Sequence, residues 1–139
     1  ADGNLVTAYY FNDRPAGDPE DLLDCRLLHI TSRPGAWTNW FAGQGLEVTE
    51  PGGMVFEQFL TAAQAAVADL GVALLPRFLV GPELARGELV VAVDRPFRSE
   101  YGYYLAVPRD RTRSRPVVAF REWLLAAIAG ETTAGEASR

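Results

Sequence analysis

Short apolar runs alternate with turn-forming residues along the chain, and no run is longer than a single strand or helix requires. The run 72–75 is entirely apolar between Gly71 and Pro76, which is typical of an interior strand of a parallel sheet. It is one of six segments whose β-branched, aromatic or apolar composition predicts strands: 5–11, 26–30, 46–49, 72–75, 88–93 and 101–107.

Capping signals and helical spacing predict helices between and after these strands. They fall after Asp18 and over 36–44, 54–70, 82–87 and 116–129. In 54–70 the apolar positions form one face, which we expect in the core: Phe56, Phe59, Leu60, Ala63, Val67 and Leu70. Gly71 stands where a glycine in the left-handed conformation commonly ends a helix. Residues 130–139 lack large apolar side chains and are predicted to form a flexible tail.

Strands that alternate with helices over short connections predict an α/β fold, with a mixed sheet and helices on both of its faces. The composition agrees with a globular domain, since 48% of the 139 residues are hydrophobic and 22% are charged. The net charge of −5 disfavours contact between this chain and nucleic acid. All thirteen basic residues are arginine, which excludes lysine chemistry such as Schiff-base formation.

One cysteine, Cys25, and one histidine, His29, limit the possible sites further. An internal disulfide and a multi-histidine metal site are excluded, and we expect neither a metal nor a cofactor. No stretch approaches the roughly 18 apolar residues of a membrane span, and the first residues lack the features of a secretion signal. These features lead us to expect a cytoplasmic protein without membrane contact.

The residues give little support for catalysis. A nucleophilic triad needs a base, and His29 lies within an apolar run, where a satisfied, half-buried side chain is the commoner explanation. Cys25 is separated from it by a predicted helix-to-strand junction, and the carboxylates are scattered at turns and helix starts. We therefore expect no catalytic residues and no enzyme, while a small α/β enzyme using Cys25, His29 and Ser32 stays open as an alternative.

Two further signals concern anions. Gly52 and Gly53 open the predicted helix 54–70, so an anion could bind its free N–H groups, although a simple strand-to-helix turn explains them better. Four arginines alternate with polar residues over 109–115, between Pro108 and Pro116. This pattern favours a solvated linker over a phosphate site.

The loop 31–37 is the best candidate for binding. Thr31, Ser32, Arg33 and Trp37 gather where a strand ends and a helix begins, a place where open α/β sheets commonly bind ligands. Trp37 has a second interpretation as an anchor of the hydrophobic core.

Longer motifs resemble a known family. The stretch 56–76 contains an amphipathic helix with an alanine-rich turn, followed by Gly-Val-Ala-Leu-Leu-Pro, and Gly-Glu-Leu-Val comes later. With the pieces 21–29, 33–41 and 101–105 in the same order, the chain resembles the effector-binding domain of LysR-type transcriptional regulators, in the branch of the glycine cleavage activator.

The resemblance implies a fold similar to type 2 periplasmic binding proteins, with one near-complete subdomain and part of a second. Residues 1–107 would form the second subdomain, with hinge strands at 5–11 and 101–107, and 108–129 the carboxy-terminal helix of the first, followed by the tail. The implied function is sensing of a small-molecule effector by cleft closure. The ligand-binding residues it implies are Thr31, Ser32, Arg33, Trp37, Tyr101 and Tyr103.

Partners also follow from the resemblance. The helix from about Ala36 and the strand after it would contribute to a homo-oligomer, and DNA would be bound by a helix-turn-helix in another part of the parent protein, not by this chain. A purely structural fragment that dimerises through exposed apolar surfaces stays open as a second alternative, because the apolar stripe of 116–129 has no obvious sheet to cover.

Overall fold

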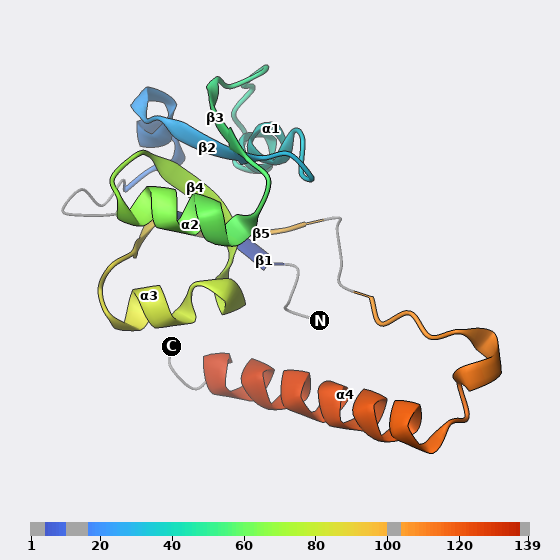
Figure 1. Cartoon of the computed structure of the whole chain (residues 1–139). Coiled ribbons are helices and arrows are strands. Elements are labelled where there is room, and N and C mark those ends of the chain that lie inside the picture. Colours follow the sequence, from blue (N-terminus) through green and yellow to red (C-terminus); the bar gives the residue numbers. More distant parts are fainter. Residues whose placement is uncertain (1–4, 11–16, 100–103, 137–139) are drawn as a thin grey trace. The chain divides into compact units, whose positions relative to one another are not determined.

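A computed structural model of the chain describes residues 5–10, 17–99 and 104–136. The described chain groups into two compact units, the first ending at residue 99 and the second beginning at residue 104. Residues 104–107 thus group with the second unit. Figure 1 shows the path of the chain through both.

The first unit is built on a five-stranded sheet with the strand order β3-β2-β4-β1-β5. Strand β2 is parallel to both β3 and β4, whereas β1 is antiparallel to both β4 and β5. The mixed sheet predicted from the sequence is therefore confirmed. The strands are β1 Leu5–Tyr10, β2 Leu27–Ile30, β3 Gly53–Phe56, β4 Val72–Pro76 and β5 Val90–Arg98.

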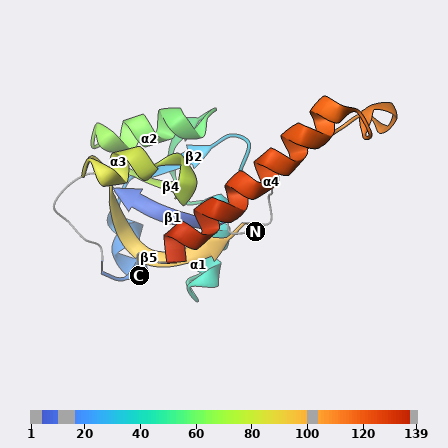
Figure 2. The same cartoon turned by 90° about the horizontal axis from the view of Figure 1, so that it is seen from below.

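Helices lie on both faces of this sheet, as expected. Figure 2 shows α2 and α3 on one side and α1 on the other. The α-helices are α1 Ala36–Gly43, α2 Phe59–Val67 and α3 Gly81–Ala85, and the 3₁₀ helices are η2 Pro19–Asp24 and η3 Arg77–Leu79. The side-chain period of two in β2 and β4 divides their apolar residues between these faces.

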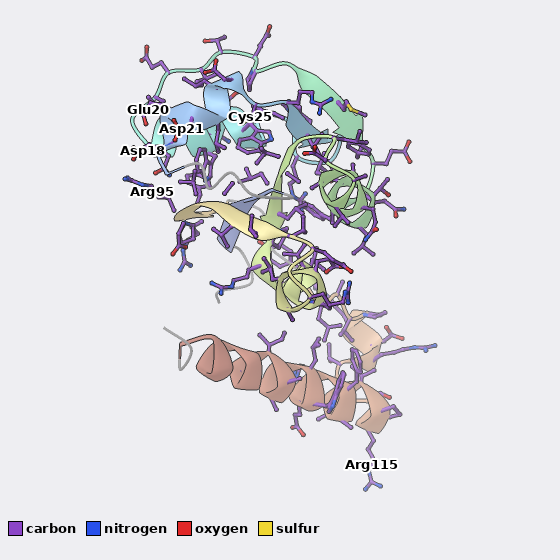
Figure 3. All side chains as sticks on the ribbon, turned by 90° about the vertical axis from the view of Figure 1, so that its left-hand side faces the viewer. Asp18, Glu20, Asp21, Cys25, Arg95 and Arg115 are labelled. Atoms are coloured by element: carbon purple, nitrogen blue, oxygen red, sulfur yellow. The ribbon has the colours of Figure 1, made fainter. Side chains whose placement is uncertain are left out.

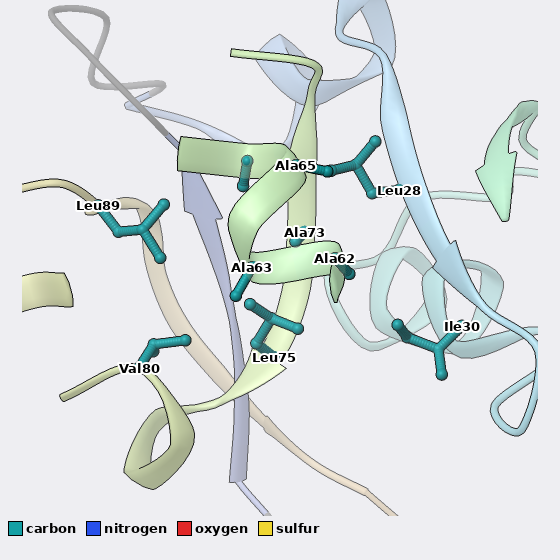
Figure 4. Packing of buried hydrophobic residues seen from close by; sticks show 10 residues of the cluster. Leu28, Ile30, Ala62, Ala63, Ala65, Ala73, Leu75, Val80 and Leu89 are labelled. Carbon is teal, nitrogen blue, oxygen red and sulfur yellow. The ribbon is translucent and has the colours of Figure 1, made fainter. Parts of the chain in front are cut away.

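We call the side covered by α2 the alanine face. Leu28, Ile30, Ala73 and Leu75 of the sheet meet the alanines of α2 there, and Figure 4 shows this packing. Four of the nine residues of α2 are buried alanines, so the helix approaches the sheet closely. The buried residues of the alanine face are Leu28, Ile30, Ala62, Ala63, Ala65, Ala66, Ala73, Leu75, Val80 and Leu89.

We call the opposite side the aromatic face, because the large rings of α1 fill it. Trp37, Trp40 and Phe41 are at most 1% exposed, and their ring centroids lie 5.2–5.7 Å apart. Both indole N–H groups have backbone acceptors, since Trp37 donates to the Leu28 carbonyl at 2.9 Å and Trp40 to that of Arg95 at 3.2 Å. The other buried residues of this face are Leu22, Leu27, Val72, Leu74, Ala92 and Val93.

Between β1 and β2, the turn before η2 is held by a carboxylate. Asp21 Oδ2 accepts hydrogen bonds from the backbone N–H groups of Gly17 and Asp18, both at 3.1 Å. Asp18 occupies the predicted N-cap position, although the helix that follows is a 3₁₀ helix. Asp18, Glu20 and Asp21 lie together at the surface in Figure 3.

The predicted strand 46–49 and the predicted start of the following helix at Met54 are wrong. Residues 46–49 have no regular structure, and Gly53–Phe56 forms β3 in their place. The helix begins only at Phe59, and Leu60, expected in the core, is 59% exposed. The apolar spacing of Phe56 and Phe59 fits a helix, but parallel pairing with β2 fixes residues 53–56 as a strand.

The end of α2 also differs from the expectation. The residue in the left-handed conformation is Asp69, with φ of 60°, not Gly71. Gly71 is required for another reason, because a Cβ there would lie 2.3 Å from the Arg26 carbonyl oxygen. The glycine therefore allows the chain to enter β4 directly beside the backbone that leads into β2.

The second unit consists of a 3₁₀ helix, η4 Arg109–Arg111, and the long helix α4 Arg115–Glu136. The predicted helix 116–129 is present but continues to Glu136, so the expected tail is helical over 130–136, although this segment contains two glycines and two threonines, which have low helix propensity. Residues 104–107 form no strand, and 101–103 lie outside the described residues. Among the described helices, none is both long enough and apolar enough to cross a membrane.

Strand β5 pairs with β1 in antiparallel orientation. The pairing runs from Leu5 opposite Arg98 to Tyr10 opposite Val90, with two register irregularities. The strand extends five residues beyond its predicted end at Val93.

Candidate functional site

The loop that follows β2 is fastened to the end of the neighbouring strand. The Thr31 backbone N–H donates to the Phe56 carbonyl at 2.8 Å, and the Thr31 hydroxyl donates to the same oxygen at 3.2 Å. A tight turn follows, in which the Arg33 N–H donates to the Ile30 carbonyl at 2.9 Å. The carboxyl ends of the parallel strands β2 and β3 thereby hold Thr31 and Arg33 in defined positions.

A pocket of about 400 Å³ lies beside this loop, within the usual size range of small-molecule sites. Two segments form its walls, namely the end of β2 with its loop and the segment leading into the edge strand β3. The lining residues are His29, Ile30, Thr31, Arg33 and Pro34 from the first segment and Pro51, Gly52, Gly53 and Val55 from the second.

Arg33 contributes the cationic group of the pocket. Its side chain reaches toward α2, where the guanidinium carbon lies 5.8 Å from the centroid of the Phe59 ring, within range of a cation–π contact. One guanidinium nitrogen also donates to the Ser32 carbonyl at 3.1 Å. These contacts restrict the half-buried side chain to the rim of the pocket, at the end of the sheet.

His29 is the second ionisable side chain of the lining. Its Nε2 atom is buried and has no hydrogen-bond partner. Gly53 lies against the ring, since a Cβ at that position would be 2.9 Å from His29 Cδ2 and 1.9 Å from the Leu27 carbonyl oxygen. Any side chain at residue 53 would thus disrupt both the strand pairing and the pocket wall.

The structure brings together only part of the set named from the sequence. Thr31 and Arg33 line the pocket, whereas Ser32 is exposed beside it. Trp37 is not in the pocket: it is 1% exposed, and its only hydrogen-bond donor is bound to Leu28, so the core interpretation is correct. Tyr101 and Tyr103 lie outside the described residues.

Sequence reasoning missed the other wall. The interpretation of Gly52 and Gly53 as a helix start is wrong, because they lead into β3 instead. His29 was expected to be a satisfied side chain, and its Nε2 is not. The information that was missing is the parallel register, which sets His29 opposite Val55. The sequence signal that could have predicted this strand is the Gly-Gly pair followed by Met-Val-Phe.

Cys25 lies apart from this pocket. Its thiol donates to the Asp21 carbonyl at 3.5 Å, and its side chain, labelled in Figure 3, packs against the aromatic face. The described residues contain no group of three or more histidine, cysteine, aspartate or glutamate side chains arranged to hold a metal ion.

Comparison with known proteins gives a family match over residues 7–129, to the LysR substrate binding domain. Curated relatives include the HTH-type transcriptional activator AmpR of Citrobacter koseri, 33% identical over 77% of this chain and 36% of that protein. The glycine cleavage system transcriptional activator of Escherichia coli K12 is 31% identical over 86% of this chain and 39% of that protein. The chain thus spans well under half the length of these relatives.

Solved structures agree on the fold. The effector domain of the transcriptional regulator AmpR of Pseudomonas aeruginosa superposes with a TM-score of 0.84 at 28% identity, over 95% of this chain and 64% of that one. The AmpR effector binding domain from Citrobacter freundii gives 0.77 at 21% identity, over 92% and 65%. The expected partial effector-domain fold, similar to type 2 periplasmic binding proteins, is confirmed, and the chain belongs to the LysR substrate-binding domain family.

Proposed function

We propose that this chain is the effector-sensing part of a LysR-type transcriptional regulator and that it binds a small metabolite in the pocket at the end of β2. The observation that carries the proposal is that Thr31 and Arg33 line a pocket at the carboxyl ends of two parallel strands. Open α/β sheets bind ligands at this edge. The family match over residues 7–129 supports the same assignment.

Each residue of the loop has a chemical role in this proposal. Arg33 provides charge and N–H donors, and the exposed Ser32 hydroxyl can donate or accept. The Thr31 hydroxyl already donates its hydrogen to Phe56, so toward a ligand it acts as an acceptor. Trp37 does not contact the ligand in this proposal; it anchors α1, the helix that follows the loop, in the core. Tyr101 and Tyr103 are proposed ligand contacts on the strength of the resemblance alone.

The proposed signal is a shift between an open and a closed cleft. A ligand can shift such an equilibrium only by its difference in affinity for the two states, and each tenfold difference contributes about 1.4 kcal/mol. In the proposed arrangement residues 1–107 belong to the second subdomain and 108–129 to the first. The signal would be passed to DNA by a helix-turn-helix elsewhere in a cytoplasmic, homo-oligomeric parent protein.

The two alternatives are less well supported. An enzyme using Cys25, His29 and Ser32 requires the three to meet, but Cys25 packs against the aromatic face and does not line the pocket with His29. The relatives reported above are transcriptional regulators. A purely structural, dimerising fragment is tested by light scattering on the whole chain, and it would show dimerisation without any response to small molecules.

The experiment is a thermal unfolding screen of the whole chain against the twenty amino acids and a set of small carboxylic and phosphorylated metabolites. At least one compound is expected to raise the Tm of the wild type by several degrees, because a ligand that binds only the native state stabilises it. The same compound should have little effect on Thr31→Val or Arg33→Gln. Equal stabilisation of wild type and both variants would contradict the site.

A further inference from the structure

Positive charge is concentrated in one short segment of this acidic chain. Residues 1–108 contain 14 acidic and 7 basic residues, whereas residues 109–121 contain five arginines and one aspartate. Four of these arginines alternate with polar residues over 109–115, a segment that we call the arginine turn. The net charge of −5 therefore describes the chain as a whole, but not this segment of the second unit, which is locally basic.

The backbone of the arginine turn has a defined shape. The Arg111 N–H donates to the Pro108 carbonyl at 3.0 Å, and the Ser114 N–H donates to the Arg111 carbonyl at 3.0 Å. The Thr112 hydroxyl also donates to the Arg109 carbonyl at 3.0 Å. The sequence pattern favoured a solvated linker, and the segment is exposed, but these hydrogen bonds fold it into two consecutive turns. A partner that fixes its position therefore has less disorder to remove.

The charges of the arginine turn do not serve the fold of the second unit. All four arginine side chains are exposed, and no ion pair involving 109–115 is present among the described residues. Figure 3 shows the Arg115 side chain extending away from α4. Arginine at the first position of a helix is electrostatically unfavourable, because the N-terminus of a helix carries partial positive charge. Local charges that oppose the fold are typical of binding surfaces.

From these observations we infer that the arginine turn binds the phosphate backbone of double-stranded DNA without reading its sequence. Arginine suits phosphate, since its planar guanidinium donates two parallel hydrogen bonds to the oxygens of one group. In 3₁₀-like turns of about 2 Å per residue, seven residues span about 14 Å, along which a DNA duplex presents about eight phosphates. The exposed Ser114 hydroxyl adds a donor of the kind that commonly contacts phosphate.

The second unit fits a phosphate backbone better than an anionic membrane. A helix that lies on such a membrane carries its basic residues along its polar face. In α4 the charged residues beyond Arg121 are all glutamates, namely Glu122, Glu131 and Glu136. A helix lying on an anionic bilayer would bring these carboxylates toward charges of the same sign, whereas contact through the arginine turn alone does not.

This inference goes beyond the proposed function, which concerns the pocket of the first unit. It rests on that function only for the choice of DNA, because the proposed parent protein binds DNA through a separate helix-turn-helix. It differs from the expectation drawn from the net charge, since such contacts depend on where charge is located. The two tests are distinguishable, because the metabolite screen reports on the pocket and the salt dependence of DNA binding reports on the arginine turn.

The experiment is a fluorescence anisotropy titration of a labelled DNA duplex with the whole chain at several salt concentrations. Each phosphate contact contributes about 0.9 to the slope of log affinity against log salt concentration. Four contacts therefore predict a loss of affinity of about 150-fold between about 50 and 200 mM salt. A second duplex of unrelated sequence should bind equally well, because the backbone is the same.

Two double variants with the same change in charge locate the contact. Arg111→Gln with Arg113→Gln removes two of the four contacts, so binding should weaken at low salt and the salt effect should fall to about 12-fold. Arg77→Gln with Arg98→Gln, which changes two exposed arginines of the first unit, should leave the salt effect unchanged. Circular dichroism checks that both variants fold, as expected for substitutions of exposed side chains.

Three results would overturn the inference. The first is the absence of duplex binding at about 50 mM salt, where such contacts are strongest. The second is an equal loss of binding in the two double variants, which would mean that only the overall charge matters. The third is tighter binding to phosphatidylglycerol vesicles than to the duplex, which would assign the arginine turn to a membrane surface instead.

Discussion

The two faces of the central sheet are filled in opposite ways. On the aromatic face, α1 places three large rings, Trp37, Trp40 and Phe41, against the strands. On the alanine face, the fully buried residues of α2 are four alanines, and the helix lies close to β2 and β4. Both helices cover the sheet, α1 through buried aromatic rings and α2 through buried alanines.

This difference determines how each face should respond to a change in volume. A close-packed interior relaxes only partly around a deleted side chain, so removal of a ring leaves a cavity. The same interior accommodates a larger side chain only by strain, and the alanine face has the least space for added volume. The aromatic face should therefore be sensitive to truncation and the alanine face to enlargement.

The largest effect is expected from Trp40→Ala. Trp40 is 0% exposed, contacts both neighbouring rings and donates to the Arg95 carbonyl, so truncation leaves a cavity and an unpaired backbone oxygen. The free energy of unfolding should fall by about 3–5 kcal/mol. Urea denaturation measures it, and Trp123→Ala on α4, where the ring is 63% exposed, is the control. Equal losses in both variants would contradict the account of the aromatic face.

Enlargement of the alanine face comes next. Ala66 is 0% exposed on the side of α2 that packs against the sheet, so Ala66→Leu should lower the free energy of unfolding by about 1–3 kcal/mol. Gln64→Leu adds a similar apolar side chain on the exposed side of the same helix and should change it little. If the two variants had equal stability, the close packing of α2 would be disproved.

A smaller effect is expected from Leu60→Ala. The sequence pattern places Leu60 in the core, whereas the structure leaves 59% of it exposed. Truncation should therefore change the free energy of unfolding by no more than about 0.5 kcal/mol. A loss near the 2–5 kcal/mol of a buried leucine, measured by the same denaturation, would restore the helical face predicted from the sequence.

The smallest effect concerns the surface between α3 and β5, at the margin of the alanine face. The hydrogen bond from Arg86, at 2.8 Å, lowers the pKa of Glu88, and the nearby positive charge acts in the same direction. A lowered pKa in the folded state means that the stabilisation is present above the ordinary glutamate pKa and is lost as the pH falls through the lowered value.

The comparison of wild type with Glu88→Gln measures this effect. The wild type should be slightly more stable at neutral pH, and the difference should vanish under acid conditions, because the carboxylate is exposed and solvent screens the pair. Glu47→Gln, on an exposed residue of the loop after α1, is the matched control. A stability difference that grew toward acid pH would have the wrong sign.

Local signals were sufficient where they agreed with the long-range pairing. The apolar run between Gly71 and Pro76 identified β4, and helical spacing over 36–44 identified α1. They failed at residues 53–58, where the spacing of Phe56 and Phe59 satisfies a helix as well as a strand. The choice is made by the pairing of β3 with β2, which joins residues about 26 positions apart.

The candidate site shows the same limit. Thr31 and Arg33 were predictable because a strand ends at Ile30 and turn-forming residues follow. Trp37 is a residue type that often contacts ligands, but its position in α1 directs its side chain into the core. The place of His29 in the pocket lining depends on Gly53 of the paired strand, which lies against its ring. No local sequence pattern contains this relationship.

The central claim is that small molecules are sensed through the loop at the end of β2. The most direct test is the Tm shift that the best compound of the metabolite screen produces in wild type and in Arg33→Gln, measured side by side. The account predicts a shift of several degrees in the wild type that is largely lost in the variant. An undiminished shift in a folded Arg33→Gln chain would contradict it.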